Sequence, residues 1–181
     1  RGRNAELHRV RRPLTVAQFG NSLALIIEFV KGASLSEHIK AGPLTLKVWL
    51  DVAVQLADAL AVIHQQRIIH KDINPANIIF DPEAGKLKLI DFGIAEELKR
   101  DKSTQSNGGF EGTLAYISPE QTGRMNRSVD HRTDLYSAGI SLYEALAGAR
   151  PFGADDPLEM VHQHIAARPL PLESKLPGTP R

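Results

Sequence analysis

The chain lacks cysteine altogether: none occurs among its 181 residues. This absence excludes disulfide bonds and thiolate chemistry, and it fits the reducing cytoplasm, where we expect the protein to act. Long apolar runs are also missing, since none approaches the roughly 20 residues that a membrane helix requires. We therefore expect no membrane segment in this chain. A starting methionine and a secretory leader are absent as well, so we expect the chain to be a piece of a longer protein.

An excess of charge of one sign is missing too. The net charge is +1, which does not favour nucleic acid or an acidic surface as the main partner. Five arginines do stand among the first twelve residues, namely Arg1, Arg3, Arg9, Arg11 and Arg12. They permit a nucleic-acid patch, but no aromatic residue interleaves with them, which favours a solvated terminus. We therefore expect no nucleic-acid partner.

What is present is an ordinary globular composition, 42% hydrophobic and 24% charged, which predicts one domain with a real core. Apolar periodicity and helix-start signals predict an α+β chain that is mostly helical with a few short strands. The expected elements are a buried strand over 23–29, a helix from Ser34 to about Lys40, a long amphipathic helix over 47–66, a strand pair over 78–80 and 87–90 with a turn at 81–85, a loop over 97–112, a helix over 133–147 ended by Gly148, a helix from Asp156 that Pro169 stops, and an extended tail over 171–181.

Two short motifs on either side of the predicted strand pair carry the chemistry. They are His70-Lys71-Asp72-Ile73-Asn74-Pro75-Ala76-Asn77 and Asp91-Phe92-Gly93. Asp72 can accept the proton of a hydroxyl group. Asn77 and Asp91 supply hard oxygen ligands, which suit Mg²⁺ bound to phosphates. The order and spacing of the two motifs predict a site for phosphoryl transfer.

A third run, Gly112-Thr113-Leu114-Ala115-Tyr116-Ile117-Ser118-Pro119-Glu120, follows at a suitable distance. The three motifs together resemble the catalytic loop, the metal-binding turn and the end of the activation segment of protein kinases. The resemblance implies a protein kinase-like α+β fold, mostly the helical C-terminal lobe with the last strands of the N-terminal lobe. It implies a remnant of the N-lobe and the hinge over 1–30, an incomplete C-lobe over 31–168 and an extended tail over 169–181. ATP and Mg²⁺ are the implied cofactors.

The same resemblance assigns roles to single residues. Asp72 is the catalytic base, and Asn77 and Asp91 bind the metal. Thr113 hydrogen-bonds near Asp72, and Asp134 binds the backbone of the catalytic loop. A plain helix N-terminal charge is the other interpretation of Asp134, and its position in the pattern favours the specific role.

The strand over 23–29 resembles the kinase hinge, where adenine binds. The backbone carbonyl of Glu28 and the backbone groups of Val30 would bind the adenine edge. Ile27 would guard the back pocket, and Ile79 would pack beneath the purine. These side chains do not specify adenine by themselves, because an ordinary core strand has the same composition.

We expect the following histidines, and Glu120, to have structural roles and not catalytic ones. By the resemblance, His70 packs with Phe92 in an apolar column, and Glu120 pairs with an arginine of a later helix that this chain does not include. We expect His64 to be a core histidine with a backbone partner. We expect three further histidines to lie at the surface, namely His131, His162 and His164.

Two residues depart from the kinase pattern. Lys71 replaces an arginine that clasps a phosphorylated activation loop, and lysine is only a point charge, so we do not expect activation through phosphorylation of Ser103, Thr104 or Ser106.

Asn74, which we count among the catalytic residues, replaces a lysine that neutralises the transferring phosphate. Loss of one such donor costs about 10²–10³ in rate. Slow transfer, an altered acceptor and no transfer are all compatible with asparagine there.

The Gly-rich phosphate loop and the Val-Ala-x-Lys strand of kinases are not found in the sequence. Our hypothesis is that residues 1–181 by themselves are unstable and inactive.

The run from Gly112 to Asp134, with the catalytic loop, resembles the serine/threonine kinase-like domain at the front of large bacterial sensor proteins. In those proteins an ATPase module, a GAF domain and a histidine kinase unit follow.

We therefore expect an ATP-dependent serine/threonine kinase domain of a signalling protein. Its partner would be a protein substrate or the downstream sensor and histidine kinase domains of the same chain. Two alternatives stay open. One is a pseudokinase-type regulatory module that binds nucleotide or a partner without phosphotransfer. The other is a small-molecule phosphotransferase, against which the Ser118-Pro119-Glu120 segment argues.

Overall fold

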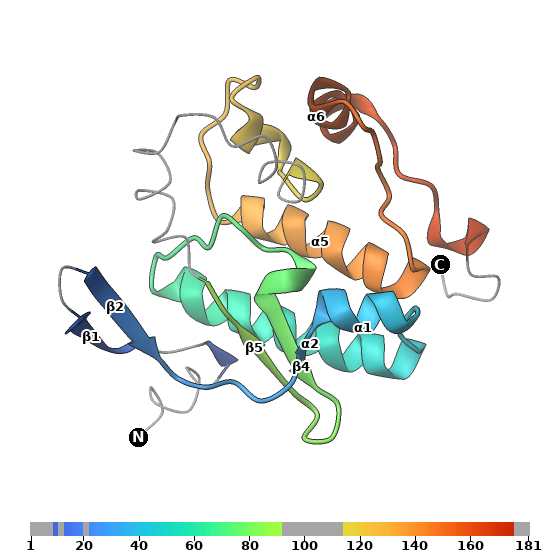
Figure 1. The fold of residues 1–181 in the computed structure, drawn as a ribbon. Helices are drawn as coiled ribbons and strands as arrows, with labels where there is room; N and C mark the ends of the chain where they lie inside the picture. The colour runs from blue at the N-terminus through green and yellow to red at the C-terminus, as the bar shows by residue number, and fades with distance from the viewer. Residues whose placement is uncertain (1–8, 11–12, 20–21, 92–113, 176–181) are drawn as a thin grey trace.

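In the part of the chain that the structure describes, a three-stranded antiparallel sheet and four helices form the body of the molecule (Figure 1). The computed structural model describes residues 9–10, 13–19, 22–91 and 114–175. The sheet has the order β3–β4–β5, and a separate hairpin is formed by β1 and β2. The bounds are β1 (Pro13–Phe19), β2 (Ser22–Ile27), β3 (Ala33–Ser34), α1 (Leu35–Ala41), α2 (Leu46–Gln65), β4 (Ile78–Asp81), β5 (Lys86–Leu89), α5 (Arg132–Ala147) and α6 (Pro157–Ala166), with 3₁₀ turns at Pro75–Asn77, Pro119–Thr122 and Leu172–Ser174.

Local sequence signals explain where the helices begin and end. Ser34 forms a capping box with Glu37, in which each side chain bonds the backbone N–H of the other residue. Asp156 caps α6, and Pro157 occupies its first turn. Helix α5 ends at Gly148, which adopts a left-handed backbone with φ 72°. These signals are local, so the predicted helices are confirmed to within one or two residues, apart from the end of α6.

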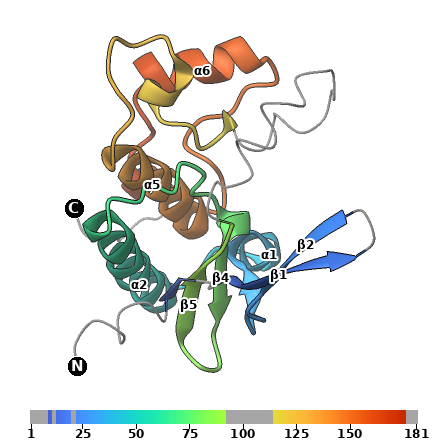
Figure 2. The same ribbon diagram turned by 90° about the vertical axis from the view of Figure 1, so that its left-hand side faces the viewer.

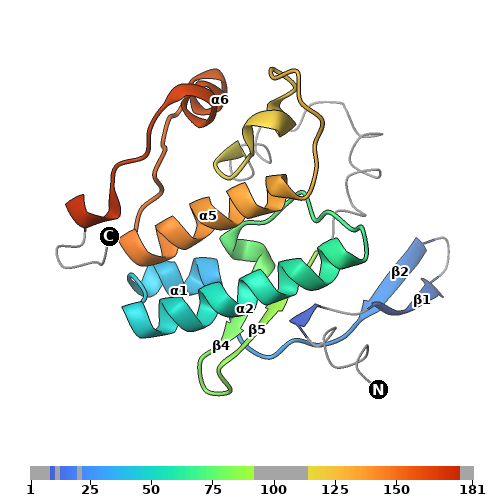
Figure 3. The same ribbon diagram turned by 180° about the vertical axis from the view of Figure 1, so that it is seen from behind.

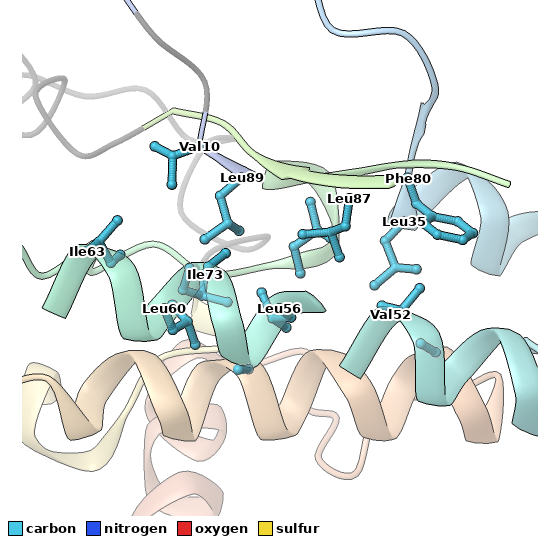
Figure 4. Packing of buried hydrophobic residues seen from close by; sticks show 14 residues of the cluster. Val10, Leu35, Val52, Leu56, Leu60, Ile63, Ile73, Phe80, Leu87 and Leu89 are labelled. Carbon is cyan, nitrogen blue, oxygen red and sulfur yellow. The ribbon is translucent and has the colours of Figure 1, made fainter. Parts of the chain in front are cut away.

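The main core lies between the sheet and helix α2 (Figure 4). Side chains of α2 recur at intervals of three and four, which places one apolar face of the helix against the sheet. From β5, Leu87 and Leu89 point toward that face. The buried residues of this cluster include Val52, Leu56, Leu60 and Ile63 of α2, and Leu35 of α1. The predicted apolar stripe of this helix is therefore confirmed.

The body is layered, with the sheet on α2, and α2 on α5 (Figures 2 and 4). The indole Nε1 of Trp49 in α2 donates a hydrogen bond of 2.8 Å to the carbonyl of Leu142 in α5. Helix α6 lies on the far side of α5 from the sheet, and the β1–β2 hairpin stands away from the helices (Figures 1 and 3). None of the described helices has the length and apolarity needed to cross a membrane.

The predicted fold needs correction in several places. The strand over 23–29 ends at Ile27, and Phe29 is 86% exposed, so its burial was wrongly predicted. Strand β1 was not predicted at all, although it pairs with β2 along its length. Helix α6 ends at Ala166, three residues before Pro169, and the tail includes a 3₁₀ turn over Leu172–Ser174 instead of being extended throughout. The predicted loop over 97–112 lies outside the described residues.

Candidate active site

The loop from His70 to Asn77 joins α2 to β4 and carries Asp72 at its centre. Both carboxylate oxygens of Asp72 accept hydrogen bonds from side-chain amides. The Nδ2 of Asn74 donates to Oδ1 at 3.0 Å, and the Nδ2 of Asn77 donates to Oδ2 at 3.0 Å. The structure therefore brings these three predicted site residues together, with the carboxylate held on both sides.

The turn after Asp72 is itself fixed by Asn74. Its side-chain oxygen accepts the backbone N–H groups of Ala76 at 2.9 Å and Asn77 at 3.3 Å. Asn74 is thereby the N-cap of the 3₁₀ turn Pro75–Asn77, and Pro75 suits the first turn because it has no N–H to satisfy. This cap was not predicted from the sequence, although Asn before Pro, a common turn start, was the available signal.

The strand pair brings Asp91 close to Asn77. The backbone N–H of Ile90 donates to the carbonyl of Asn77 at 3.0 Å, so the residue after Ile90 leaves the sheet beside the start of β4. Asp91 has a left-handed backbone with φ 56°. The nitrogen of the Asn77 amide is bound to Asp72, and within the described residues its oxygen accepts no hydrogen bond and is left for a ligand. An amide oxygen and a nearby carboxylate form a donor set that fits Mg²⁺.

Asp134 anchors the catalytic loop from helix α5. Its side chain is fully buried and accepts the backbone N–H of His70 at 2.9 Å and of Lys71 at 2.8 Å. The predicted role of Asp134 is therefore confirmed. The Nε2 of His64 lies 2.7 Å from the same carboxylate. The prediction of a backbone partner for His64 was wrong, because a carboxylate 70 residues away occupies that place.

His70 is a buried structural residue, as predicted. Its ring Nε2 lies 3.0 Å from the carbonyl of Ile90, which ties the catalytic loop to the segment before Asp91. Burial lowers the pKa of His70, which favours a neutral ring. The other half of the predicted pair, Phe92, lies outside the described residues.

A second link reaches the catalytic loop from the 3₁₀ turn Pro119–Thr122. Gln121 donates its amide to the carbonyl of Lys71 at 2.8 Å, and its amide oxygen accepts from the backbone of Ser118 at 3.1 Å. Lys71 has φ 66°, so its peptide groups are held in a rarely adopted conformation. Gln121 was not predicted to be a site residue, because its contact joins residues 50 positions apart. The Ser-x-x-Gln capping spacing was the available signal.

Glu120 lies beside the same turn. Its carboxylate accepts the hydroxyl of Thr133 at 2.7 Å, and that hydroxyl also receives a hydrogen bond from Ser118 at 3.2 Å. The predicted ion pair of Glu120 with an arginine of a later helix stays a prediction. Thr113, predicted to lie near Asp72, falls outside the described residues.

The predicted adenine-binding segment follows β2. The carboxylate of Glu28 forms an ion pair with Lys88 of β5, which connects this segment to the sheet. Val30 is half-buried, and Ile79 is half-buried in β4 opposite Ser34 of β3. The proposed contacts of Glu28, Val30 and Ile79 with a purine stay predictions.

One histidine was placed wrongly by the sequence. His131 and His162 are exposed as predicted, but His164 is only 4% exposed. Its ring packs edge-on against Phe152, and its Nδ1 lies 2.9 Å from the hydroxyl of Tyr136. Burial lowers the pKa of His164. This residue therefore belongs to the packing between α5 and α6.

Comparison with known proteins agrees with this geometry. The family model described as "Protein kinase domain" matches residues 5–177. The chain belongs to the protein kinase family. The matched range takes in all three motifs of the sequence, which supports the kinase-like fold.

Several bacterial kinases are similar to this kinase chain over most of its length. It is 38% identical over 174 residues to serine/threonine-protein kinase pkn2 of Myxococcus xanthus, covering 94% of this chain and 21% of that protein. It is 37% identical over 163 residues to PknA of Mycobacterium tuberculosis, covering 90% and 37%. It is 36% identical over 155 residues to PknB of Mycobacterium leprae, covering 85% and 24%. The chain thus spans between about a fifth and two fifths of these relatives.

Proposed function

We propose that the protein transfers the γ-phosphoryl group of ATP to serine or threonine hydroxyls of a protein. The observation that carries the proposal is the Asp72 carboxylate, held by Asn74 and Asn77 at 3.0 Å each. A base in phosphoryl transfer has to be oriented toward the attacking hydroxyl, because positioning supplies most of the catalysis. The names of the similar kinases support serine and threonine as acceptors.

In this proposal each site residue has one task. Asp72 orients the acceptor hydroxyl and takes its proton. Asn77 and Asp91 would hold Mg²⁺, which neutralises charge on the phosphates when it is bound. Thr113 would support Asp72 from the activation segment. Asn74 would donate a hydrogen bond to the carboxylate of Asp72.

The nucleotide base would lie on the segment after β2. The backbone of Glu28 and Val30 would bind the adenine edge, and Ile79 would pack beneath it. The ion pair between Glu28 and Lys88 supports this placement, because it connects that segment to β5, beside the strand that carries Ile79. The partners would be a protein substrate or downstream sensor and histidine kinase domains of the same polypeptide, in the cytoplasm.

Transfer from γ-labelled ATP with Mg²⁺, by the full-length protein, tests the proposal. The label is scored after acid treatment, because phosphoserine and phosphothreonine survive acid whereas phosphohistidine does not. We expect acid-stable label that Asp72→Asn and Asp91→Asn abolish and that Asp51→Asn, an exposed carboxylate on α2, preserves. Nucleotide binding without acid-stable label would contradict the proposal and indicate a regulatory module instead.

A further inference from the structure

The amide of Asn74 contacts the proposed base with one end and the turn that carries Asn77 with the other. We propose that Asn74 is a positioning residue, which fixes the carboxylate of Asp72 relative to Asn77. The inference rests on the proposed function and deepens it, because it assigns a task to a residue that departs from the kinase pattern. Asn74 lacks the charge of the lysine that kinases have at this position, and in this inference it orients the base instead.

The donor end of Asn74 acts on the carboxylate directly. Its Nδ2 lies 3.0 Å from Oδ1 and 3.3 Å from the backbone carbonyl of Asp72. On the other side, Asn77 donates to Oδ2 at 3.0 Å and to the same carbonyl at 2.8 Å. The last torsion of an aspartate side chain is broad, so one amide leaves the carboxylate free to turn. Two amides on opposite oxygens hold its plane.

The acceptor end of Asn74 fixes where that amide points. Its Oδ1 accepts two consecutive backbone N–H groups, of Ala76 at 2.9 Å and of Asn77 at 3.3 Å. These bonds orient the amide plane before any substrate binds, so its N–H is already directed at Asp72. The backbone of Asn77 is fixed through the same oxygen. One side chain therefore sets the position of the base relative to the proposed metal ligand.

Few other side chains can do both tasks. Aspartate keeps the acceptor that caps the turn but has no N–H for Asp72, and it puts two carboxylates together. Lysine keeps a donor but loses the acceptor. A serine oxygen can cap the turn, but it carries a single proton on a shorter side chain. Asparagine has a donor and an acceptor on one rigid plane.

The first arm of the test is kinetic and uses Asn74→Asp in the full-length protein. The cap survives and the donor is lost, so kcat should fall by about tenfold to a hundredfold, the size expected for a misplaced group. KM for ATP should change little, because the proposed nucleotide contacts are elsewhere. The matched control is Asn126→Asp, which makes the same change at an exposed asparagine outside the site. A wild-type kcat in Asn74→Asp would overturn the inference.

The second arm does not depend on activity. It compares urea unfolding midpoints of the wild type, Asp72→Asn, Asn74→Asp and the double variant. Asp72→Asn leaves one acceptor oxygen for the two amide donors of Asn74 and Asn77, and Asn74→Asp sets two carboxylates against each other, so each single substitution should lower the midpoint. The double variant exchanges the amide and the carboxylate, restores a donor opposite an acceptor, and should recover a large part of the loss.

The two arms separate the inference from the proposed function. If the wild type transfers no phosphate, the proposed function fails, and the cycle still decides whether Asn74 fixes the Asp72 side chain. Additive midpoint losses in the double variant would show that the two side chains do not interact, which overturns the inference. A fall in kcat together with recovery in the double variant supports it.

Discussion

Replacing Asp134 tests whether a buried carboxylate holds the catalytic loop in place. The side chain is fully buried and accepts two backbone N–H groups, those of His70 and Lys71, while His64 lies 2.7 Å from the same oxygen that binds His70. In Asp134→Ala the two N–H groups lose their acceptor and His64 loses its partner. Asp134→Asn has almost the same shape but keeps only one of the two acceptor oxygens.

The expected loss follows from these contacts. Each buried donor left without a partner costs about 1–3 kcal/mol, so the two N–H groups together cost about 2–6 kcal/mol. Loss of the hydrogen bond with His64 adds to this cost and places the total in the upper half of that range. A domain has about 5–15 kcal/mol of stability in all, so Asp134→Ala should remove a large share of it. Asp134→Asn should lose about half as much.

Urea unfolding of the full-length protein measures the loss, with the fluorescence of Trp49 as the signal, since Trp49 is the single tryptophan of these 181 residues and joins α2 to α5. The exposed Asp51→Asn serves as the control and should unfold like the wild type. The reasoning is refuted if Asp134→Ala unfolds within about 1 kcal/mol of the wild type, because a satisfied buried acceptor cannot be removed at so small a cost.

Three further predictions concern caps and titration. Ser34→Ala removes the capping box of α1 and should lower the unfolding free energy by about 1 kcal/mol, measured by urea titration. Gly148→Ala should cost about 1–2 kcal/mol, because φ is 72° and the new Cβ would lie 2.9 Å from Cγ of Pro43; an unchanged melting temperature would contradict it. Burial holds the pKa of His164 below its ordinary 6.5, so below that pH the unfolded chain binds a proton that the folded chain resists. Stability should therefore fall as the pH drops below 6.5, and His164→Gln should flatten this slope in unfolding experiments between pH 7 and 5.

The secondary structure and the motif chemistry could be predicted from the sequence, because their signals are local. The capping box at Ser34 and Glu37 spans one helical turn, and the apolar stripe of α2 repeats every three or four residues. The turn at Gly148 has a positive φ, which glycine adopts without strain, so the glycine itself predicts where α5 ends. Strand β1 gave no such signal and was missed, because its identity as a strand depends on pairing with β2.

Of the long-range contacts that organise the site, only that of Asp134 with the catalytic loop was predicted, and it came from the kinase resemblance. The others could not be predicted, because they join distant parts of the chain. His64 meets a carboxylate 70 residues away, and Gln121 meets a carbonyl 50 residues away. His164 stands between Gln163 and Ile165 and was predicted to be a surface residue, yet the packing of α6 on α5 buries it. A repeating sequence pattern does not predict which distant residues come into contact, since each contact depends on how whole helices pack.

The sequence by itself determined that Asp72, Asn77 and Asp91 stand at kinase spacing, because that information is the order of residue types along the chain. Only the tertiary structure decided how Asp72 is held. The sequence showed an uncharged residue where kinases have lysine, whereas the fold places the Asn74 amide with its nitrogen on Asp72 and its oxygen on the turn. The physical reason is that a hydrogen bond depends on direction and distance in space, and these exist only once the turn Pro75–Asn77 has closed.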